Sequence, residues 1–311
     1  MPKVSVIVPI YNVEQYIERC VRSLFEQTLN DIEYIFVDDY SSDSSISILF
    51  SVLNDYPDRK NQVKIIRHRE NKGLPEARKT GIKNASGEYI IQCDSDDWVD
   101  TNMYNAMYYM AVNTQSDVVI CGYNVSDGIS NEPFVACHST EKIIFIQNCL
   151  YQKESASLCS KLFKRELFNN AIIYPQYAMG EDIALCLQLI YYSKKISFIP
   201  KPFYYYYSNP NSISKEQSEE SIISRFKQAC NNVFLLETFF ESQEKDKRIL
   251  KALDCFKHLQ RNLLAPMLFQ KQYYMVWRNT FVGLNEKVLF MPIKFKDKII
   301  FLMRLFRLRK Y

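Results

Sequence analysis

Short apolar runs alternate with segments whose apolar residues recur at helical spacing through the first third of the chain. The apolar runs are rich in Val and Ile, which is typical of buried strands in a parallel sheet. The segments between them carry the spacing of amphipathic helices, and Asn12 is the expected N-cap of the first one. We predict strands at Val4–Pro9, Glu33–Val37, Val63–Arg67 and Glu88–Cys93, and helices at Val13–Gln27, Ser44–Leu53 and Leu74–Asn84.

The remainder of the chain becomes increasingly helical. Its aromatic run Phe203–Tyr207 is typical of a strand, and Gly122–Glu141 is rich in turn-forming residues, so we expect that segment to be irregular. Gly180-Glu181-Asp182 opens an apolar helix, and the pattern is helical again from about Glu219. The further predicted elements are a helix at Met103–Ser116, a strand at Asp117–Cys121 and a helix at Ile183–Tyr192.

Polar clusters follow three of the predicted strands. Strands that alternate with helices favour a parallel sheet with right-handed crossovers, and ligands of such sheets bind beyond the carboxyl ends of the strands. The clusters are Pro9-Ile10-Tyr11-Asn12, Asp38-Asp39 and Asp94-Ser95-Asp96. We therefore expect them to form one ligand site at one edge of the sheet.

Asp94-Ser95-Asp96 is the most informative of these clusters. Residues two apart on an extended segment point the same way, so both carboxylates can face one point. Hard oxygen ligands suit Mg²⁺ or Mn²⁺, and such an ion could hold a diphosphate. The alternative is an acidic turn that closes a strand, but the neighbouring clusters favour the metal-binding interpretation.

The composition is that of a globular protein and argues against several function classes. The chain has 311 residues, 47% hydrophobic and 24% charged, which is enough for a large core. Its seven glycines form neither a dinucleotide-binding Gly-x-Gly-x-x-Gly motif nor a Gly-x4-Gly-Lys-Ser/Thr loop. Nine scattered cysteines favour reduced thiols over a disulfide framework or a zinc site. The sequence has no pattern of a signal peptide and no apolar stretch of membrane-spanning length, so we expect a cytoplasmic protein.

Charge is distributed unevenly along the chain. The net charge of +4 does not indicate a nucleic-acid partner, but from Lys287 to Tyr311 eight basic residues face Asp297 alone. Apolar residues fall at helical spacing within this segment. It can contact the cytoplasmic face of the inner membrane peripherally, or pack its apolar stripe on the protein, and the sequence leaves both open. The stripe consists of Ile299, Leu302, Met303 and Phe306.

Seven short motifs, none specific alone, occur in an order that resembles bacterial family 2 glycosyltransferases with the GT-A fold. The resemblance covers roughly Val4 to Ser214 and implies an α/β fold. That fold is a Rossmann-like, mostly parallel sheet flanked by helices, here with a mainly helical C-terminal extension. The motifs are Pro9-Ile10-Tyr11-Asn12, Val37-Asp38-Asp39, Asn71-Lys72-Gly73-Leu74, Ala77-Arg78, Gly87-Glu88-Tyr89, Asp94-Ser95-Asp96-Asp97 and Gly180-Glu181-Asp182.

The resemblance also implies a domain division and an activity. A GT-A domain is expected at 1–215, with a nucleotide-binding half at 1–115 and an acceptor half at 116–215, followed by a helical region at 216–311. Family members move a sugar from a nucleotide-diphosphate donor to an acceptor hydroxyl, usually with inversion. We expect a UDP-linked donor, Mn²⁺ or Mg²⁺ as cofactor, and a glycan or lipid-linked saccharide acceptor. Many members build surface polysaccharide, lipopolysaccharide or capsule.

Residue roles follow from the same resemblance. Asp39 is expected to contact the base and Asp94 the ribose, while Asp96, with Asp94, is expected to hold the metal. The acceptor hydroxyl needs a general base, for which Asp182 is the candidate and Glu181 its neighbour and rival. The remaining residues expected at the donor site are Pro9, Tyr11, Asn12, Lys72, Arg78 and Ser95.

The chain departs from the family pattern at two positions. Tyr40 stands where Gly is common, and Tyr resists backbone geometry that Gly permits; Lys79 stands where Asn is common.

Two other function classes are alternatives to a glycosyltransferase. A nucleotidyltransferase would need a Gly-rich N-terminal loop. A non-catalytic glycan-binding or scaffold protein would not need intact Asp94, Asp96 and Asp182. Acidic residues at a helix start also serve as caps, so the role of Asp182 depends on the resemblance.

Overall fold

The three neighbouring strands β2 (Ile32–Asp38), β1 (Val4–Ile10) and β4 (Tyr89–Gln92) at the centre of the parallel half are buried on both faces. In the computed structural model, which describes residues 1–135, 137, 139–209, 216–243 and 246–306, β1 is buried along its whole length. It pairs in parallel with β2 and β4, and β2 pairs in parallel with β3 (Val63–Arg67). The predicted parallel sheet is confirmed for this half, and the four strands end at one edge.

The other half of the sheet is mixed. The predicted irregular segment Gly122–Glu141 is wrong in its first part, because β6 continues to Ser126 and β7 turns back along it. All four residues of β7 are exposed, so it shows no apolar pattern, and Pro133 is tolerated on such an edge strand. The strand order is β3-β2-β1-β4-β8-β6-β9-β5, with β5 at Trp98–Val99, β6 at Val118–Ser126, β7 at Asn131–Phe134, β8 at Lys161–Lys164 and β9 at Ile196–Tyr207.

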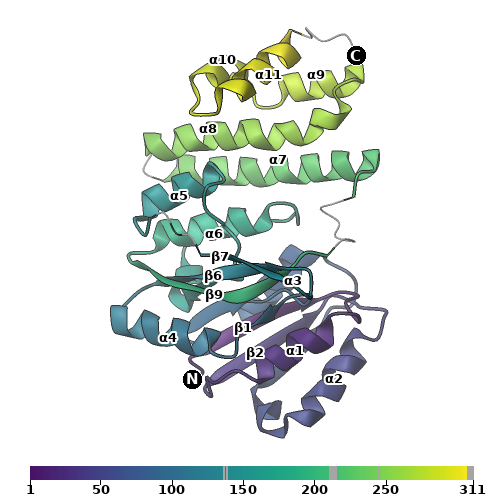
Figure 1. Ribbon diagram of the computed structural model, residues 1–311, viewed down its shortest axis with the longest axis vertical. Coiled ribbons are helices and arrows are strands. Elements are labelled where there is room, and N and C mark those ends of the chain that lie inside the picture. Colours follow the sequence, from purple (N-terminus) through teal and green to yellow (C-terminus); the bar gives the residue numbers. More distant parts are fainter. Residues whose placement is uncertain (136, 138, 210–215, 244–245, 307–311) are drawn as a thin grey trace.

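Helices cover both faces of the sheet (Figure 1). Alternate residues of β1 point to opposite faces, so Val6 packs in one apolar cluster and Ile7 in the other. The Val6 face is covered by α1 (Ile17–Phe25), α2 (Ser45–Asp55) and α4 (Met103–Thr114), and the Ile7 face by α3 (Leu74–Asn84), α5 (Lys142–Leu150) and α6 (Glu181–Tyr192). Short 3₁₀ helices lie at Pro57–Gln62 and Arg165–Asn169.

The predicted start of the first helix is wrong. Helix α1 begins at Ile17 with Tyr16 at the N-cap position, and no side chain caps it. Asn12 instead has a φ of 49°, a conformation that Asn tolerates better than most residues. Its Oδ1 accepts a hydrogen bond from the Ser42 backbone N at 2.9 Å. Asn12 therefore ties the end of β1 to the loop after β2.

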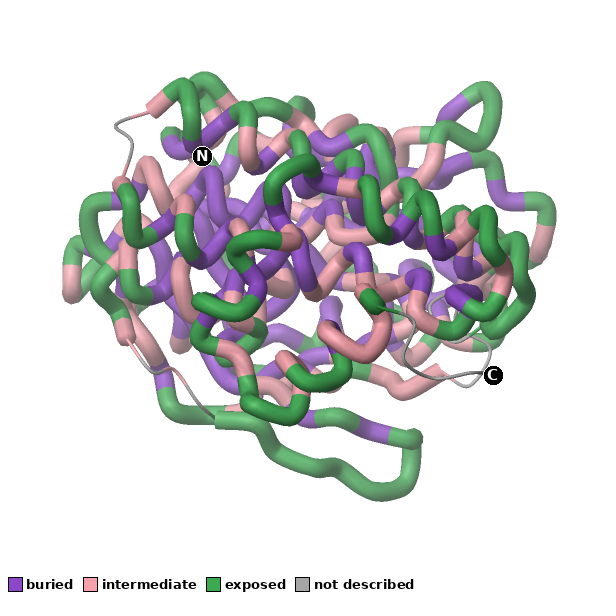
Figure 2. Tube along the Cα trace, turned by 90° about the horizontal axis from the view of Figure 1, so that it is seen from above, coloured by how far each residue is buried: buried purple, intermediate pink, exposed green. Residues whose placement is uncertain are grey.

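The C-terminal part is helical, as predicted, and shares its core with the sheet. One apolar cluster runs from Ile7 in β1 to Phe301 in the last helix, and Figure 2 shows buried residues concentrated inside the molecule. The expected boundary between a domain at 1–215 and a helical region at 216–311 remains a prediction. The helices are α7 (Glu219–Ser242), α8 (Lys247–Arg261), α9 (Lys271–Asn279), α10 (Leu284–Lys287) and α11 (Phe295–Leu305), with 3₁₀ turns at Asn262–Met267 and Val288–Phe290.

The last helix buries a different residue from those of the predicted stripe. Phe301 is buried beside Trp277 and Arg261, whereas Ile299 and Phe306 are exposed. Arg307, Arg309 and Lys310 lie outside the described residues. Among the described residues, no helix combines the length and apolar character needed to cross a membrane.

Candidate functional site

The three predicted polar clusters lie at the carboxyl ends of β1, β2 and β4, which are neighbours in the sheet. Arg78, on α3, is the buried cation that links two acidic motifs there. Its Nη2 donates to Asp94 Oδ1 at 2.8 Å, and its Nε lies 2.8 Å from Glu181 Oε1. Its Nη1 donates to the side-chain oxygen of Gln92. Because a buried charge must be paired, Arg78 fixes Asp94 and Glu181 relative to each other; its contact with a donor remains a prediction.

Asp39 organises the loop that follows β3. Its buried carboxylate accepts hydrogen bonds from the backbone N of Lys72 at 2.8 Å and of Gly73 at 2.7 Å. Asp39 Oδ1 also lies 2.7 Å from His68 Nδ1. Gly73 has a φ of 84°, which glycine adopts freely, and the Lys72 side chain is exposed. The predicted contact of Asp39 with a base is not tested by this geometry.

Two exposed tyrosines stand beside these loops. Pro9 is buried at the end of β1, whereas the Tyr11 and Tyr40 side chains are about half exposed. Tyr40 adopts a φ of 71°, so the chain keeps at this position the conformation that glycine would favour, at a cost in strain. Exposed rings at this edge are suited to stacking on a planar ligand.

The Asp94-Ser95-Asp96-Asp97 turn is fixed from β9. Tyr204 Oη accepts from the Asp94 backbone N at 3.1 Å and donates to Asp97 Oδ2 at 2.5 Å. Asp97 is buried and also accepts from the Tyr207 backbone N at 2.7 Å. Burial, and then the charge of Asp94, raises the pKa of Asp96 to about 6. Asp97 thus holds the turn. Asp94 and Asp96 are partly exposed, and Asp94 lines the cavity described below whereas Asp96 lies outside its lining.

Glu181 and Asp182 lie in the first turn of α6. Glu181 is buried against Arg78, and burial raises its pKa to about 7 although Arg78 opposes the shift. Asp182 is partly exposed, its Oδ1 accepts from the Ile183 backbone N at 2.8 Å, and burial raises its pKa. Glu181 is therefore committed to an ion pair, whereas Asp182 is the acidic residue of the two that reaches the cavity described next.

A cavity of about 230 Å³ opens beside these carboxylates. A second cavity of about 600 Å³ lies in the C-terminal helices, but none of the predicted site residues lines it. The chemistry of the lining therefore identifies the smaller cavity as the candidate active site. Its walls are Asp94, Asp97, Asp182, Tyr123, Tyr204, Tyr206, Ser155, Ser157 and Ser160.

The carboxylates fit one class of metal site. Asp94 and Asp96 offer the hard oxygen donors that Mg²⁺ and Mn²⁺ prefer. Within the part of the chain that the structure describes, no three His, Cys, Asp or Glu side chains gather as a metal cage. This donor set suits an ion held by one or two carboxylates together with the phosphates of a substrate.

The segment Ser155–Lys161 supplies one wall of the cavity, although none of its residues is among the site residues predicted above. Cys159 Sγ donates to Asp94 Oδ2 at 3.3 Å, and the buried Lys161 Nζ donates to the Ser157 carbonyl at 2.7 Å. The segment lies between α5 and β8, and its small polar residues have the composition of an ordinary surface loop. The antiparallel pairing of β8 with β4 and β6 brings it to the site.

Comparison with known proteins finds matches along most of the chain. The family model described as "Glycosyl transferase family 2" matches residues 5–174. EpsJ, an uncharacterized glycosyltransferase of Bacillus subtilis (strain 168), is 32% identical over 234 residues, which are 69% of this chain and 64% of EpsJ. The match therefore spans just under two thirds of that relative's length. A cholesterol galactosyltransferase of Borreliella burgdorferi is 26% identical over 315 residues, or 96% of this chain and 81% of that protein.

A solved structure supports the architecture. S. aureus TarS in complex with UDP-GlcNAc superposes with a TM-score of 0.72 at 20% identity, covering 92% of this chain and 81% of that one. Identity at this level shows a shared fold. The α/β sheet with flanking helices and a helical C-terminal part is thus the GT-A fold expected from the sequence.

Proposed function

Because this chain belongs to glycosyl transferase family 2, we propose that it transfers a sugar from a nucleotide-diphosphate sugar to a hydroxyl group of a glycan or lipid-linked acceptor. The observation that carries the proposal is the single cavity lined by both Asp94 and Asp182. This cavity brings together Asp94, from the motif suited to a donor diphosphate, and Asp182, from the motif suited to supply the base. The UDP-GlcNAc bound to TarS, which has the same fold, supports a UDP-linked donor.

The proposed reaction is a single displacement with inversion. The acceptor oxygen attacks the anomeric carbon from the face opposite the diphosphate, and the bond to the phosphate oxygen breaks with its electron pair leaving on the nucleotide. Asp182 takes the proton of the acceptor hydroxyl as the new bond forms. Its raised pKa makes it a stronger base than an exposed Asp, and its place in the first turn of α6 favours the anion it must be before the transfer.

Asp96, with Asp94, is proposed to hold Mn²⁺ or Mg²⁺ on the diphosphate. When bound, such an ion stabilises the negative charge that develops on the leaving group. Arg78 keeps Asp94 oriented, since it donates to Asp94 Oδ1 while Cys159 donates to Oδ2. Tyr11 and Tyr40 are proposed to stack on the nucleoside, beside the loop that Asp39 holds.

We also infer peripheral contact with a membrane, through a C-terminal surface made of exposed apolar residues and neighbouring lysines. Phe290 and Phe295 are 81% and 78% exposed, which is unusual for side chains of this size. Such a surface suits an enzyme whose acceptor is lipid-linked, and the resemblance supports surface polysaccharide, lipopolysaccharide or capsule as the product. The C-terminal surface consists of Phe290, Phe295, Ile299, Ile300, Phe306, Lys294, Lys296 and Lys298.

The activity is tested by UDP release from UDP-glucose, UDP-galactose and UDP-GlcNAc with Mn²⁺, using bacterial envelope glycolipids as acceptors. The native chain should release UDP from one donor, and Asp182→Asn should abolish turnover while UDP affinity stays within a few-fold. Asp58→Asn, at an exposed position in a 3₁₀ helix away from the cavity, is the matched control and should keep full activity. NMR of the product reports whether the anomeric centre is inverted.

Three results would contradict this proposal. Near-normal turnover by Asp182→Asn would show that Asp182 is not the base. Turnover by Glu181→Gln would then test Glu181 in that role. Retention at the anomeric centre would exclude single displacement. Binding of glycans without UDP release from any donor would instead favour a non-catalytic glycan-binding protein.

A further inference from the structure

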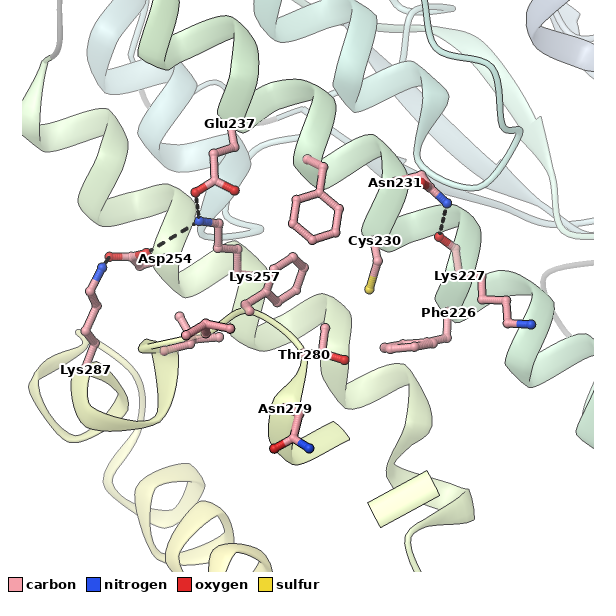
Figure 3. Close-up of a pocket in the computed structure, with 14 residues that line it drawn as sticks. Phe226, Lys227, Cys230, Asn231, Glu237, Asp254, Lys257, Asn279, Thr280 and Lys287 are labelled. Atoms are coloured by element: carbon pink, nitrogen blue, oxygen red, sulfur yellow. Dashed lines mark hydrogen bonds and ion pairs between the residues drawn. The ribbon is translucent and has the colours of Figure 1, made fainter. Parts of the chain in front are cut away.

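The cavity of about 600 Å³ in the C-terminal region is formed by three separate segments (Figure 3). Helix α7 contributes Phe226, Cys230 and Phe234, which lie four residues apart on one face. Helix α8 contributes Lys257, and the turn between α9 and α10 contributes Phe281. The hollow is within the size range of small-molecule binding sites.

The turn that closes the cavity is held in a strained conformation. Phe281 has a φ of 59°, which is rare for a bulky residue and costs free energy. Its ring is buried and packs against Phe234, with centroids 5.2 Å apart and planes at 55°. The Phe234 ring is itself about half exposed. The strained turn thus places the Phe281 ring beside Phe234 along the cavity.

On one wall of the cavity, lysine and carboxylate side chains alternate in a series of neighbouring ion pairs. Lys257 pairs with Glu237 and lies 4.0 Å from Asp254, and Asp254 pairs with Lys287 at 2.8 Å. Lys257 is buried, and its ammonium lies 5.8 Å from the centre of the Phe281 ring. Lys257 and Lys287 each have a carboxylate partner, so this wall offers mainly hydrogen-bond donors and acceptors. Lys227, exposed on α7, adds one further positive charge to the lining.

We propose that this cavity is a second saccharide-binding site, which takes a neutral segment of the acceptor glycan. Apolar rings on one side and paired polar groups on the other match a sugar ring, which has C–H faces and a hydroxyl edge. Asn231, Asn279 and Thr280 add further hydrogen-bonding groups at the rim. A lipid chain would leave the charges unsolvated, and a phosphate would meet carboxylates that already pair with the lysines.

This inference depends on the proposed function, because it makes the cavity a holding point for the acceptor of the same reaction. A chain held at two places gains effective concentration at the active site. The second site should therefore lower the KM for long acceptors and leave donor binding unchanged. It should also bind glycan without any donor, which separates its failure from failure of the transferase proposal.

The test is saturation-transfer NMR and calorimetry with neutral hexasaccharides of glucose, galactose and N-acetylglucosamine, without nucleotide. One of them should bind, and Phe234→Ala and Asn231→Ala should each weaken that binding about tenfold or more. Both positions are exposed on α7, so the variants should fold, as circular dichroism will show. Phe50→Ala, a phenylalanine of similar exposure on α2 and outside the cavity, is the matched control and should bind normally.

Several outcomes would overturn the proposal. The first is that the native chain binds none of the hexasaccharides. The second is that Phe50→Ala loses as much binding as Phe234→Ala. The third is that Asp182→Asn loses binding while Phe234→Ala keeps it, which would assign the sugar to the active site. Displacement of the sugar by millimolar tripolyphosphate in the native chain would indicate an anion site instead. UDP binding measured on the same samples should not change in either α7 variant.

Discussion

Arg78 is the residue on which the geometry of the candidate active site depends. Its guanidinium contacts Asp94 at the end of β4 and Glu181 at the start of α6, two motifs far apart in the sequence. The side chains of Arg78 and Glu181 are only 5% and 4% exposed, so water cannot stabilise either charge alone. The pair therefore couples the donor side of the cavity to the side that carries the candidate base.

Replacing Arg78 by Met should destabilise the fold substantially. The change leaves the buried Glu181 without a partner, and breaking a buried ion pair in this way costs about 3–5 kcal/mol. Urea unfolding monitored by circular dichroism measures the loss. Adding Glu181→Gln to Arg78→Met should recover part of it, because the stranded charge is gone. A single variant that loses less than about 1 kcal/mol would show that the pair does not hold the site together.

Asp96 should act through the metal. Asp96→Ala removes one oxygen ligand and should weaken Mn²⁺-dependent UDP binding by about tenfold or more, the scale on which metal sites respond to lost partners. Binding of UDP without metal should change little. Calorimetric titration with and without Mn²⁺ makes the comparison, and Asp58→Ala is the exposed control. Overlapping titration curves for Asp96→Ala and the native chain would remove Asp96 from the metal shell.

At the scale of single elements, the contact between α3 and β1 shows how tightly the helix that carries Arg78 is placed. A Cβ on Gly81 would lie 2.3 Å from Ile7 Cγ2, closer than carbon atoms can approach. An exposed helical Gly gains about 1 kcal/mol on replacement by Ala. Here the overlap should dominate, so Gly81→Ala should lose about 1–3 kcal/mol of unfolding free energy.

A second substitution isolates the cause of that loss. In an Ile7→Ala background the overlapping methyl is absent, and Gly81→Ala should then be neutral or stabilising. Lys83→Ala, at an exposed position of the same helix, controls for general effects on α3. Urea unfolding of the four chains gives the coupling between the two positions. Equal losses in both backgrounds would show that crowding against Ile7 is not the reason.

Elements with a strong apolar period were predictable, and elements whose form depends on distant partners were not. Strand Val63–Arg67 and helix Leu74–Asn84 have the predicted bounds, since each carries its own pattern. Strand β8 at Lys161–Lys164 has no such pattern and exists through its pairing with β4 and β6. Likewise the acidic motifs could be found by their residue types. The Arg78–Glu181 pair could not, because it forms only when α3 and α6 meet.

At the scale of the whole molecule, positive charge and exposed apolar surface gather in one region. From Phe269 onward the chain has ten Lys and Arg against two acidic residues, so the region has a net charge of +8 although the whole chain has only +4. The preceding part is therefore acidic overall. The same region holds the exposed rings of Phe269, Phe290, Phe295 and Phe306. Lipids with anionic headgroups match both features.

The chain should therefore bind anionic vesicles through the C-terminal surface. It should float with vesicles that contain phosphatidylglycerol and not with pure phosphatidylcholine, and rising salt should weaken the association because charges are screened. Phe290→Ser combined with Phe295→Ser should reduce flotation, whereas Phe50→Ser, an exposed ring on α2, should not. Equal flotation with neutral vesicles, or equal loss with Phe50→Ser, would mean that this surface is not the membrane contact.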